Sequence, residues 1–341
     1  MKSIALIAAS GSALLLSACG DKSTTQNSDK ENQELTNSSS STPGKTLTSL
    51  DQLELSIAFN TAAPHPADKG TYLEFPGDAN KPGKNKHIVL LSGDEEYRSE
   101  EAMPMLAQIL SAQGFKCTVL FSLDKNNKFV DPTNQESLTN SVALDSADAI
   151  VMGLRFRKYG EKDMEKFVAA FQRGTPIVAL RTSTHPFNFP ANSKYAKYAW
   201  NAKEATGWKG GFGRHVLGET WVNHHGHHKK EGTRTISAKP SKDASILNGV
   251  GTIFAKTDVY GAAPKDPSNI LLKGEVTQTL DSKSAAVAGK KNNPMMPVAW
   301  TRHYKNASGK TNKIFTTTMG SADDLSDENL RRLVVNAVYW G

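Results

Sequence analysis

Cysteine is scarce in this sequence, and long apolar runs are missing beyond its N-terminus. Only two cysteines, Cys19 and Cys117, occur in 341 residues, which excludes a fold stabilised by a disulfide framework. Multi-pass membrane classes are excluded because no later apolar run is long enough to span a bilayer. Lys and Arg number 41 against 34 Asp and Glu, but they form no basic stripe, so we expect no nucleic-acid partner.

The first residues resemble a bacterial lipoprotein signal. Lys2 precedes an apolar stretch over 4–16, which is too short to cross a bilayer comfortably, and Leu16-Ser17-Ala18-Cys19 follows. We therefore expect residues 1–18 to be removed and Cys19 to be lipidated, which would anchor an exported protein to the cell envelope. Gly20 in place of Asp favours the outer membrane in the sorting pattern that this signal resembles. The alternative is an ordinary signal peptide with an incidental cysteine.

Three composition changes divide the rest of the chain. Residues 19–46 are almost entirely polar and predict a disordered tether. Residues 47–86 contain scattered Leu, Ile and Phe and then a Pro/Gly/Lys-rich stretch, and we interpret them as an extended lead-in segment. A regular pattern starts at residue 87 and continues to residue 341, which predicts one α/β domain.

Short apolar runs alternate with helical patterns in this domain. Apolar runs at 87–93, 117–121, 148–153 and 176–180 are typical of strands buried on both faces. Further strands are expected at 297–300 and 313–318, and a last helix has Leu330, Leu333, Val334, Ala337 and Val338 on one face. The alternation predicts a three-layer sandwich with a mainly parallel, doubly wound sheet.

Reactive side chains follow these strands. They lie at 93–98, 155–157, 181–185 and 319–324. In doubly wound sheets, ligands bind outside the carboxyl ends of the strands, so a binding cleft is expected where these loops meet. The alternative is that the loops are polar only because they lie at the surface, but this explains the three arginines that follow two strands less well.

Several motifs stand out, at 93–110, 155–160, 179–187, 212–234, 257–261, 292–304 and 315–325. Together they resemble the ThuA-like, or trehalose-utilisation, family, in particular its secreted branch in planctomycete- and verrucomicrobia-type bacteria. The resemblance implies a flavodoxin-like fold of the class I glutamine amidotransferase type. It also implies a link to carbohydrate utilisation, but no settled reaction.

The chain departs from these relatives at two turns. Class I amidotransferases carry a nucleophilic cysteine after the strand that corresponds to 176–180, where this chain has Leu180-Arg181-Thr182. Cys117 lies inside a predicted strand, where a thiol is usually a small apolar group, so glutaminase chemistry is excluded. Many ThuA-like members have a histidine at this turn and Gly-His-Asp after the last strand; here Arg181 and Gly320-Ser321-Ala322 stand instead.

The catalytic candidates are His185, Asp94 and Glu95. His185 follows the fourth strand, and its ordinary pKa near neutrality suits acid–base work. A desolvated carboxylate after the first strand could act as general base. Each candidate also has a structural interpretation: a buried histidine bonded to backbone, or carboxylates that form ion pairs with arginines.

The substrate-binding candidates surround these groups. Arginines are suited to clamp a carboxylate or phosphate, or to donate to sugar hydroxyls. The candidates are Glu96, Arg98, Arg155, Arg157, Arg181, Thr182, His224, His225 and Met319.

The histidine loop His224-His225-Gly226-His227-His228 has two interpretations. Imidazole is the commonest metal ligand, so His224, His225, His227 and His228 are candidates to bind a divalent metal such as zinc. Alternatively, the loop is a polar lid over the predicted cleft.

These observations favour a cell-envelope lipoprotein that acts on a sugar, a keto-sugar or another small polar substrate. Proton-transfer chemistry such as isomerisation, or hydrolysis, is the expected reaction type. Two alternatives remain: a non-catalytic carbohydrate-binding lipoprotein, and a metalloprotein built on the histidine loop.

Overall fold

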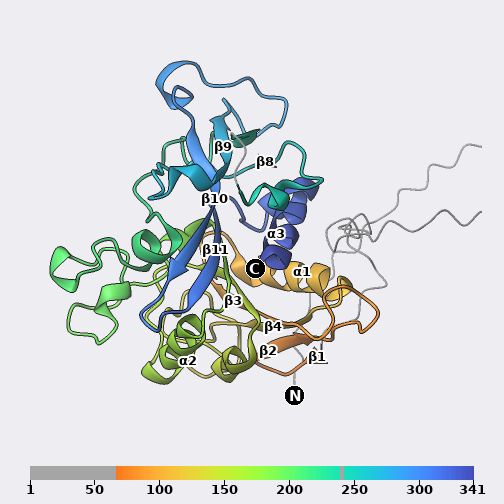
Figure 1. The fold of residues 1–341 in the computed structure, drawn as a ribbon, viewed down its shortest axis with the longest axis vertical. Helices are drawn as coiled ribbons and strands as arrows, with labels where there is room; N and C mark the ends of the chain where they lie inside the picture. Colours follow the sequence, from red (N-terminus) through yellow and green to blue (C-terminus); the bar gives the residue numbers. More distant parts are fainter. Residues whose placement is uncertain (1–66, 239–241) are drawn as a thin grey trace, which may run out of the picture. The chain divides into compact units, whose positions relative to one another are not determined.

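The computed structural model describes residues 67–238 and 242–341 (Figure 1). The predicted signal peptide, Cys19, the tether and the first part of the lead-in segment lie outside the described residues. None of the helices in the described ranges is long and apolar enough to cross a bilayer.

Eleven strands form one sheet in the order β1-β2-β4-β3-β5-β6-β11-β10-β9-β7-β8. The strands are β1 (Ala67–Asp68), β2 (Tyr72–Phe75), β3 (His87–Gly93), β4 (Lys116–Leu120), β5 (Ala149–Leu154), β6 (Ile177–Leu180), β7 (Thr233–Ser237), β8 (Phe254–Ala255), β9 (Ile270–Val276), β10 (Met296–Lys305) and β11 (Thr311–Thr317). The α-helices are α1 (Ser99–Ala112), α2 (Glu161–Gln172) and α3 (Glu328–Trp340).

The α/β class is as predicted, but the expectation of a mainly parallel sheet is wrong, because the sheet is mixed. Strands β4, β3, β5, β6 and β11 are parallel, in the 2-1-3-4-5 order of flavodoxin-type sheets. All pairings outside this group are antiparallel. The cause is clearest at β10 and β11, where residues 306–310 are too few for a crossover and form a hairpin turn.

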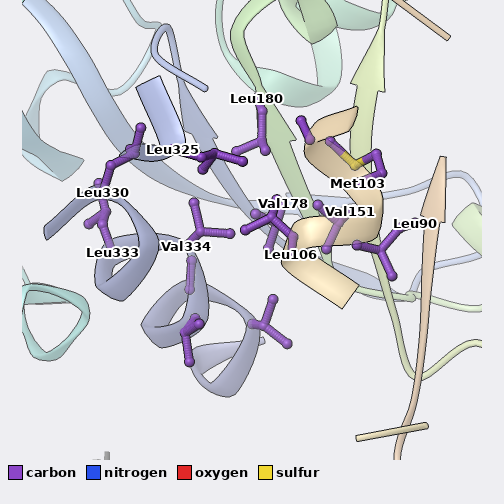
Figure 2. Close-up of a cluster of buried hydrophobic side chains, with 14 of the residues drawn as sticks. Leu90, Met103, Leu106, Val151, Val178, Leu180, Leu325, Leu330, Leu333 and Val334 are labelled. Carbon is purple, nitrogen blue, oxygen red and sulfur yellow. The ribbon is translucent and has the colours of Figure 1, made fainter. Parts of the chain in front are cut away.

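Two apolar clusters cover the two faces of the parallel strands. Figure 2 shows one of them, where Leu106 of α1 and Val334 of α3 lie near Val178 of β6. Helix α2 packs on the other face through side chains such as Phe167 and Phe171. Helices therefore lie on both sides of the parallel part of the sheet. Because β3, β5, β6 and β11 are parallel neighbours, their carboxyl ends lie along one edge of the sheet.

Cys117 lies inside β4 and is fully buried. Burial raises the pKa of its thiol far above the usual range, so the reactive thiolate does not form at ordinary pH. This agrees with the prediction that Cys117 is a small core residue.

Candidate functional site

The loop after β3 is organised by the buried carboxylate of Asp94. Its Oδ1 accepts the backbone N–H groups of Glu96 at 3.0 Å and Tyr97 at 3.2 Å. The hydroxyl of Thr182, in the loop after β6, donates to Oδ2. Burial raises the pKa of Asp94 to about 6. Both carboxylate oxygens are thus engaged by the protein, and they tie two loops of the carboxyl edge together.

An ion-pair network joins the loops after β3 and β5. Both Arg155 and Arg157 bond Glu95, and Arg157 Nη2 does so at 2.8 Å. Arg155 Nε also lies 3.0 Å from Glu96 Oε2. The side chain of Arg157 is fully buried and donates to the carbonyls of Arg155, Pro132 and Asn134. About a quarter of each of Glu95, Glu96 and Arg155 remains exposed, which leaves these three within reach of a ligand.

Arg181 is buried beneath this surface. Its Nη1 donates to the carbonyls of Asp258 at 2.7 Å and Thr318 at 2.8 Å, and its Nη2 donates to Asp258 Oδ1 at 2.7 Å. The guanidinium carbon lies over the rings of Tyr97 and Tyr260, 4.6 and 3.7 Å from their centroids. Arg181 therefore joins β6, β11 and the segment that follows β8.

Asp258 is the centre of a cluster that receives two residues of the histidine loop. Nδ1 of His224 lies 2.8 Å from Asp258 Oδ2, and Nδ1 of His228 lies 3.3 Å from Oδ1. Burial opposes the charge on Asp258, but the Arg181 guanidinium and the His224 imidazole outweigh it and hold the pKa of this carboxyl below its ordinary value. Asp258 is thus a buried carboxylate that two partly exposed imidazoles reach from outside.

The segment that carries Asp258 is fixed to the loop after β11 by the buried Asp324. The Thr257 N–H donates to Asp324 Oδ1 at 3.1 Å, and the Thr257 hydroxyl donates to Oδ2 at 2.7 Å. Oδ2 also accepts the N–H groups of Gly320 and Ser321. The Asp324 carboxylate therefore connects the segment that carries Asp258 to the loop that follows β11.

The other two histidines of the loop point elsewhere. Nε2 of His225 lies 2.8 Å from the carbonyl of Lys291. His227 is exposed, and its Nδ1 lies 3.2 Å from the carbonyl of His228. The structure therefore brings together His224 and His228 but not all four predicted metal ligands.

His185 lies among aromatic rings. Its ring centroid is 4.8 Å from that of Phe156, 5.7 Å from Trp221 and 6.4 Å from Tyr260. Burial, followed by the charges of Arg155 and Arg181, lowers the pKa of His185 well below its ordinary value. The imidazole is therefore neutral at physiological pH.

Three aromatic side chains near His185 form what we call the aromatic wall: Phe156, Trp200 and Trp221. The rings of Phe156 and Trp200 are 5.5 Å apart, and those of Trp200 and Trp221 are 6.2 Å apart. All three are only partly buried. Arg155 lies over the Phe156 ring at 4.8 Å and His224 lies 5.7 Å from Trp221, so the wall borders the polar groups of the site.

Strained backbone is concentrated on the same loops. Among the described residues, the positive-φ positions that are neither Gly nor Asn are Arg98, Phe156, Arg181 and Lys229. Asn tolerates positive φ, but in residues with larger side chains this conformation is strained. Such strained positions cluster at functional sites. All four lie beside the groups described above, which supports a functional role for this edge.

A cavity of about 210 Å³ opens beside the Asp258 cluster. Its lining includes Glu96, Tyr97, His228 and Asp258. A larger hollow of about 1180 Å³ lies elsewhere, against residues of the 188–206 segment, and none of the predicted site residues lines it. We place the candidate site at this edge of the sheet, where the smaller cavity and the Asp258 cluster adjoin the Glu95–Arg155 network through Glu96 and the aromatic wall through His224.

The predicted site residues fall into three sets in the structure. Glu95, Glu96, Arg155, His224 and His228 are partly exposed at the site, where Arg98 also lines the cavity; Asp94, Arg157, Arg181, Thr182, His185 and Met319 are buried at or beneath it; and His225 and His227 turn to other partners. Arg98 pairs with Asp323 at 2.6 Å. Met319 contributes its carbonyl, which accepts the Arg181 N–H at 3.0 Å.

Sequence reasoning missed Asp258 and Tyr97. Asp258 lies in the motif 257–261, but it follows a strand of only two residues, and no periodic pattern marks it. Tyr97 lies directly beside the predicted acidic residues, where its hydroxyl accepts a bond from Arg181 at 3.0 Å. No pattern in the sequence distinguishes this tyrosine from an ordinary loop residue.

Comparisons with known proteins show what the chain is similar to. The family model described as ThuA, trehalose utilisation, matches residues 87–341. A putative ThuA-like protein from Parabacteroides merdae is 13% identical with a TM-score of 0.48, over 75% of this chain and 90% of that one. For one from Bacteroides uniformis the values are 13%, 0.45, 77% and 93%. An exo-β-1,4-mannosidase from Opitutaceae bacterium strain TAV5 is 9% identical with a TM-score of 0.31, over 76% and 36%. No curated protein matches.

Proposed function

The chain belongs to the ThuA, or trehalose-utilisation, family, and we propose that it acts on a sugar or keto-sugar by acid–base chemistry. The observation that carries this proposal is the aromatic wall beside a polar cluster. Aromatic rings offer an apolar face to the C–H groups of a sugar. Arg155 lies over the Phe156 ring of the wall and pairs with Glu95 and Glu96, and the exposed parts of all three are suited to bond sugar hydroxyls.

His185 is the proposed proton acceptor. Its Nδ1 lies 3.2 Å from the Thr184 hydroxyl. Because its pKa is lowered, the ring is neutral and has a lone pair to accept a proton. Glu96 is the proposed second group, since both oxygens of Asp94 are occupied and Glu95 is shared by two arginines.

The test is incubation of the purified protein with disaccharides and their 3-keto forms, followed by NMR. We expect one class to be converted, and His185→Gln to lower kcat more than it raises KM. Trp221→Leu should weaken binding about tenfold, which corresponds to the loss of about 1.4 kcal/mol of stacking. The control is Trp208→Leu, because Trp208 stacks on His215 away from the wall. Equal effects of the two tryptophan variants would contradict the proposed role of the wall.

A non-catalytic sugar-binding protein is the second candidate, and the burial of His185 favours it. Only 4% of this side chain is exposed, whereas the rings of the wall are more accessible. Binding of a sugar without conversion, and with no effect of His185→Gln on affinity, would favour this candidate over the enzyme.

We also propose that the protein works at the cell envelope, held by lipid on Cys19. The support is the lipoprotein-type signal in the sequence. Cys19→Ala should move the protein from the membrane fraction to the soluble fraction, because a signal sequence alone leaves no acyl chain on the product. Fractionation followed by immunoblotting measures this. An undiminished membrane fraction would mean that lipidation is not the anchor.

A further inference from the structure

We propose that His224, His228 and Asp258 bind a divalent transition-metal ion such as zinc. Each offers one ligand atom, and these atoms lie within 4.8 Å of one another. Imidazole nitrogen with carboxylate oxygen is a donor set that zinc and related first-row ions accept, whereas magnesium and calcium prefer oxygen ligands alone. Of the four histidines predicted as metal ligands, the structure therefore supports only His224 and His228, and it adds the carboxylate of Asp258.

The protein orients the carboxylate of Asp258. The side chain is 1% exposed, Arg181 donates to its Oδ1 at 2.7 Å, and His224 lies 2.8 Å from its Oδ2. Hydrogen bonds that orient a ligating carboxylate are a regular part of metal sites. Arg181 is therefore a positioning residue for Asp258.

Gly226 allows the histidine loop to approach Asp258 closely. The backbone N–H groups of His225 and Gly226 both donate to the carbonyl of Val259 at 2.9 Å. A Cβ at position 226 would lie 3.1 Å from the Asp258 Cβ. This close approach places the imidazoles of His224 and His228 on the carboxylate, with 4.6 Å between their ring centroids.

The number of protein ligands and the space beside them also suit a cation. Three protein ligands leave a coordination position for water, as in catalytic zinc sites, and the cavity of about 210 Å³ lies beside His228 and Asp258. Glu96 brings a second carboxylate, whose Oε1 is 3.4 Å from His228 Nε2. Each carboxylate also has an arginine partner, Arg181 for Asp258 and Arg155 for Glu96, while Lys229 and Lys256 at the cavity are exposed to solvent.

The experiment is calorimetric titration of chelator-treated, purified full-length protein in detergent with zinc chloride. We expect one ion per chain. His224→Ala and His228→Ala should each weaken binding by more than about 100-fold, since even the outer partners of metal ligands contribute about 10- to 100-fold. The matched controls are His225→Ala and His227→Ala in the same loop, which should change affinity less than about twofold because both imidazoles point away. Cobalt(II) absorption of the same proteins should show the same pattern.

Two results would overturn this proposal. One is the absence of zinc binding up to millimolar concentration in folded protein. The other is an equal loss of affinity in all four histidine variants, which would indicate unspecific chelation by a histidine-rich loop. The measurement contains no sugar, so its failure would leave the proposed activity on carbohydrates standing.

Discussion

Arg155 and Arg181 each follow one of two neighbouring parallel strands, β5 and β6, yet their surroundings differ. Arg155 keeps a quarter of its side chain exposed and pairs with two partly exposed glutamates. Arg181 is 1% exposed; its guanidinium donates to Asp258 and Tyr97 and contacts the rings of Tyr97 and Tyr260. An arginine at the end of a strand can therefore be accessible to a ligand, as Arg155 is, or can be buried and stabilise the groups beneath the site, as Arg181 does. The neighbouring side chains determine which of these two roles the arginine has.

The largest expected difference is in stability. Arg181→Ala should lower the free energy of unfolding by about 3–5 kcal/mol, because it leaves the buried Asp258 without its cation. Arg155→Ala should cost about 1 kcal/mol or less, because its partly exposed pairs are screened by solvent. Denaturant unfolding of both variants measures this. Similar losses of unfolding free energy in the two variants would contradict the distinction between a buried structural arginine and a partly exposed one.

Stability measured as a function of pH would extend the comparison to Asp94, which is buried beneath the site like Arg181. The pKa of Asp94 is about 6 in the folded protein against an ordinary value of 3.8. Between these values the unfolded chain releases a proton that the folded chain keeps, so the contribution of Asp94 to wild-type stability falls as pH rises from about 4 to about 6. The loss is on the order of 3 kcal/mol at 1.36 kcal/mol for each pKa unit.

Asp94→Asn removes this titration. The stability of the variant relative to wild type should therefore rise by about 3 kcal/mol between pH 4 and pH 7. Urea unfolding at several pH values gives this difference, in which the other titrating groups cancel. A difference that stays constant with pH, or falls, would show that Asp94 is not the buried acid described here.

The smallest effect is expected at Cys117, away from both arginines. Cys117→Ala should lower the free energy of unfolding by about 1 kcal/mol, because it leaves a small cavity in β4. Sugar conversion or binding should be unchanged, since the thiol is buried inside the sheet. Assay of the folded variant on the best substrate tests this. A complete loss of activity would give the thiol a role that its position does not explain.

The sequence predicted the parallel strands and the edge at which they end, because strands buried on both faces are continuous apolar runs. It did not predict strand direction at β10 and β11, since alternation and hydrophobicity are the same in either direction. It also could not show that Arg181 and Asp258, 77 residues apart, form a buried pair. Such pairing depends on tertiary contacts that no local pattern records, and for the same reason His224 and His228 could not be distinguished from His225 and His227.

The four hydrogen bonds that Asp324 accepts from Thr257, Gly320 and Ser321 have a consequence for protein engineering. The segment around 257–261 and the turn 320–324 form one module, although 58 residues of chain separate them. A transplant of the candidate site onto another scaffold of this fold would have to carry both pieces together. If only one of the two segments were transferred, the Thr257 donors would lack the Asp324 carboxylate, or that carboxylate would lack the Thr257 donors. Asp258 would then no longer be held in position.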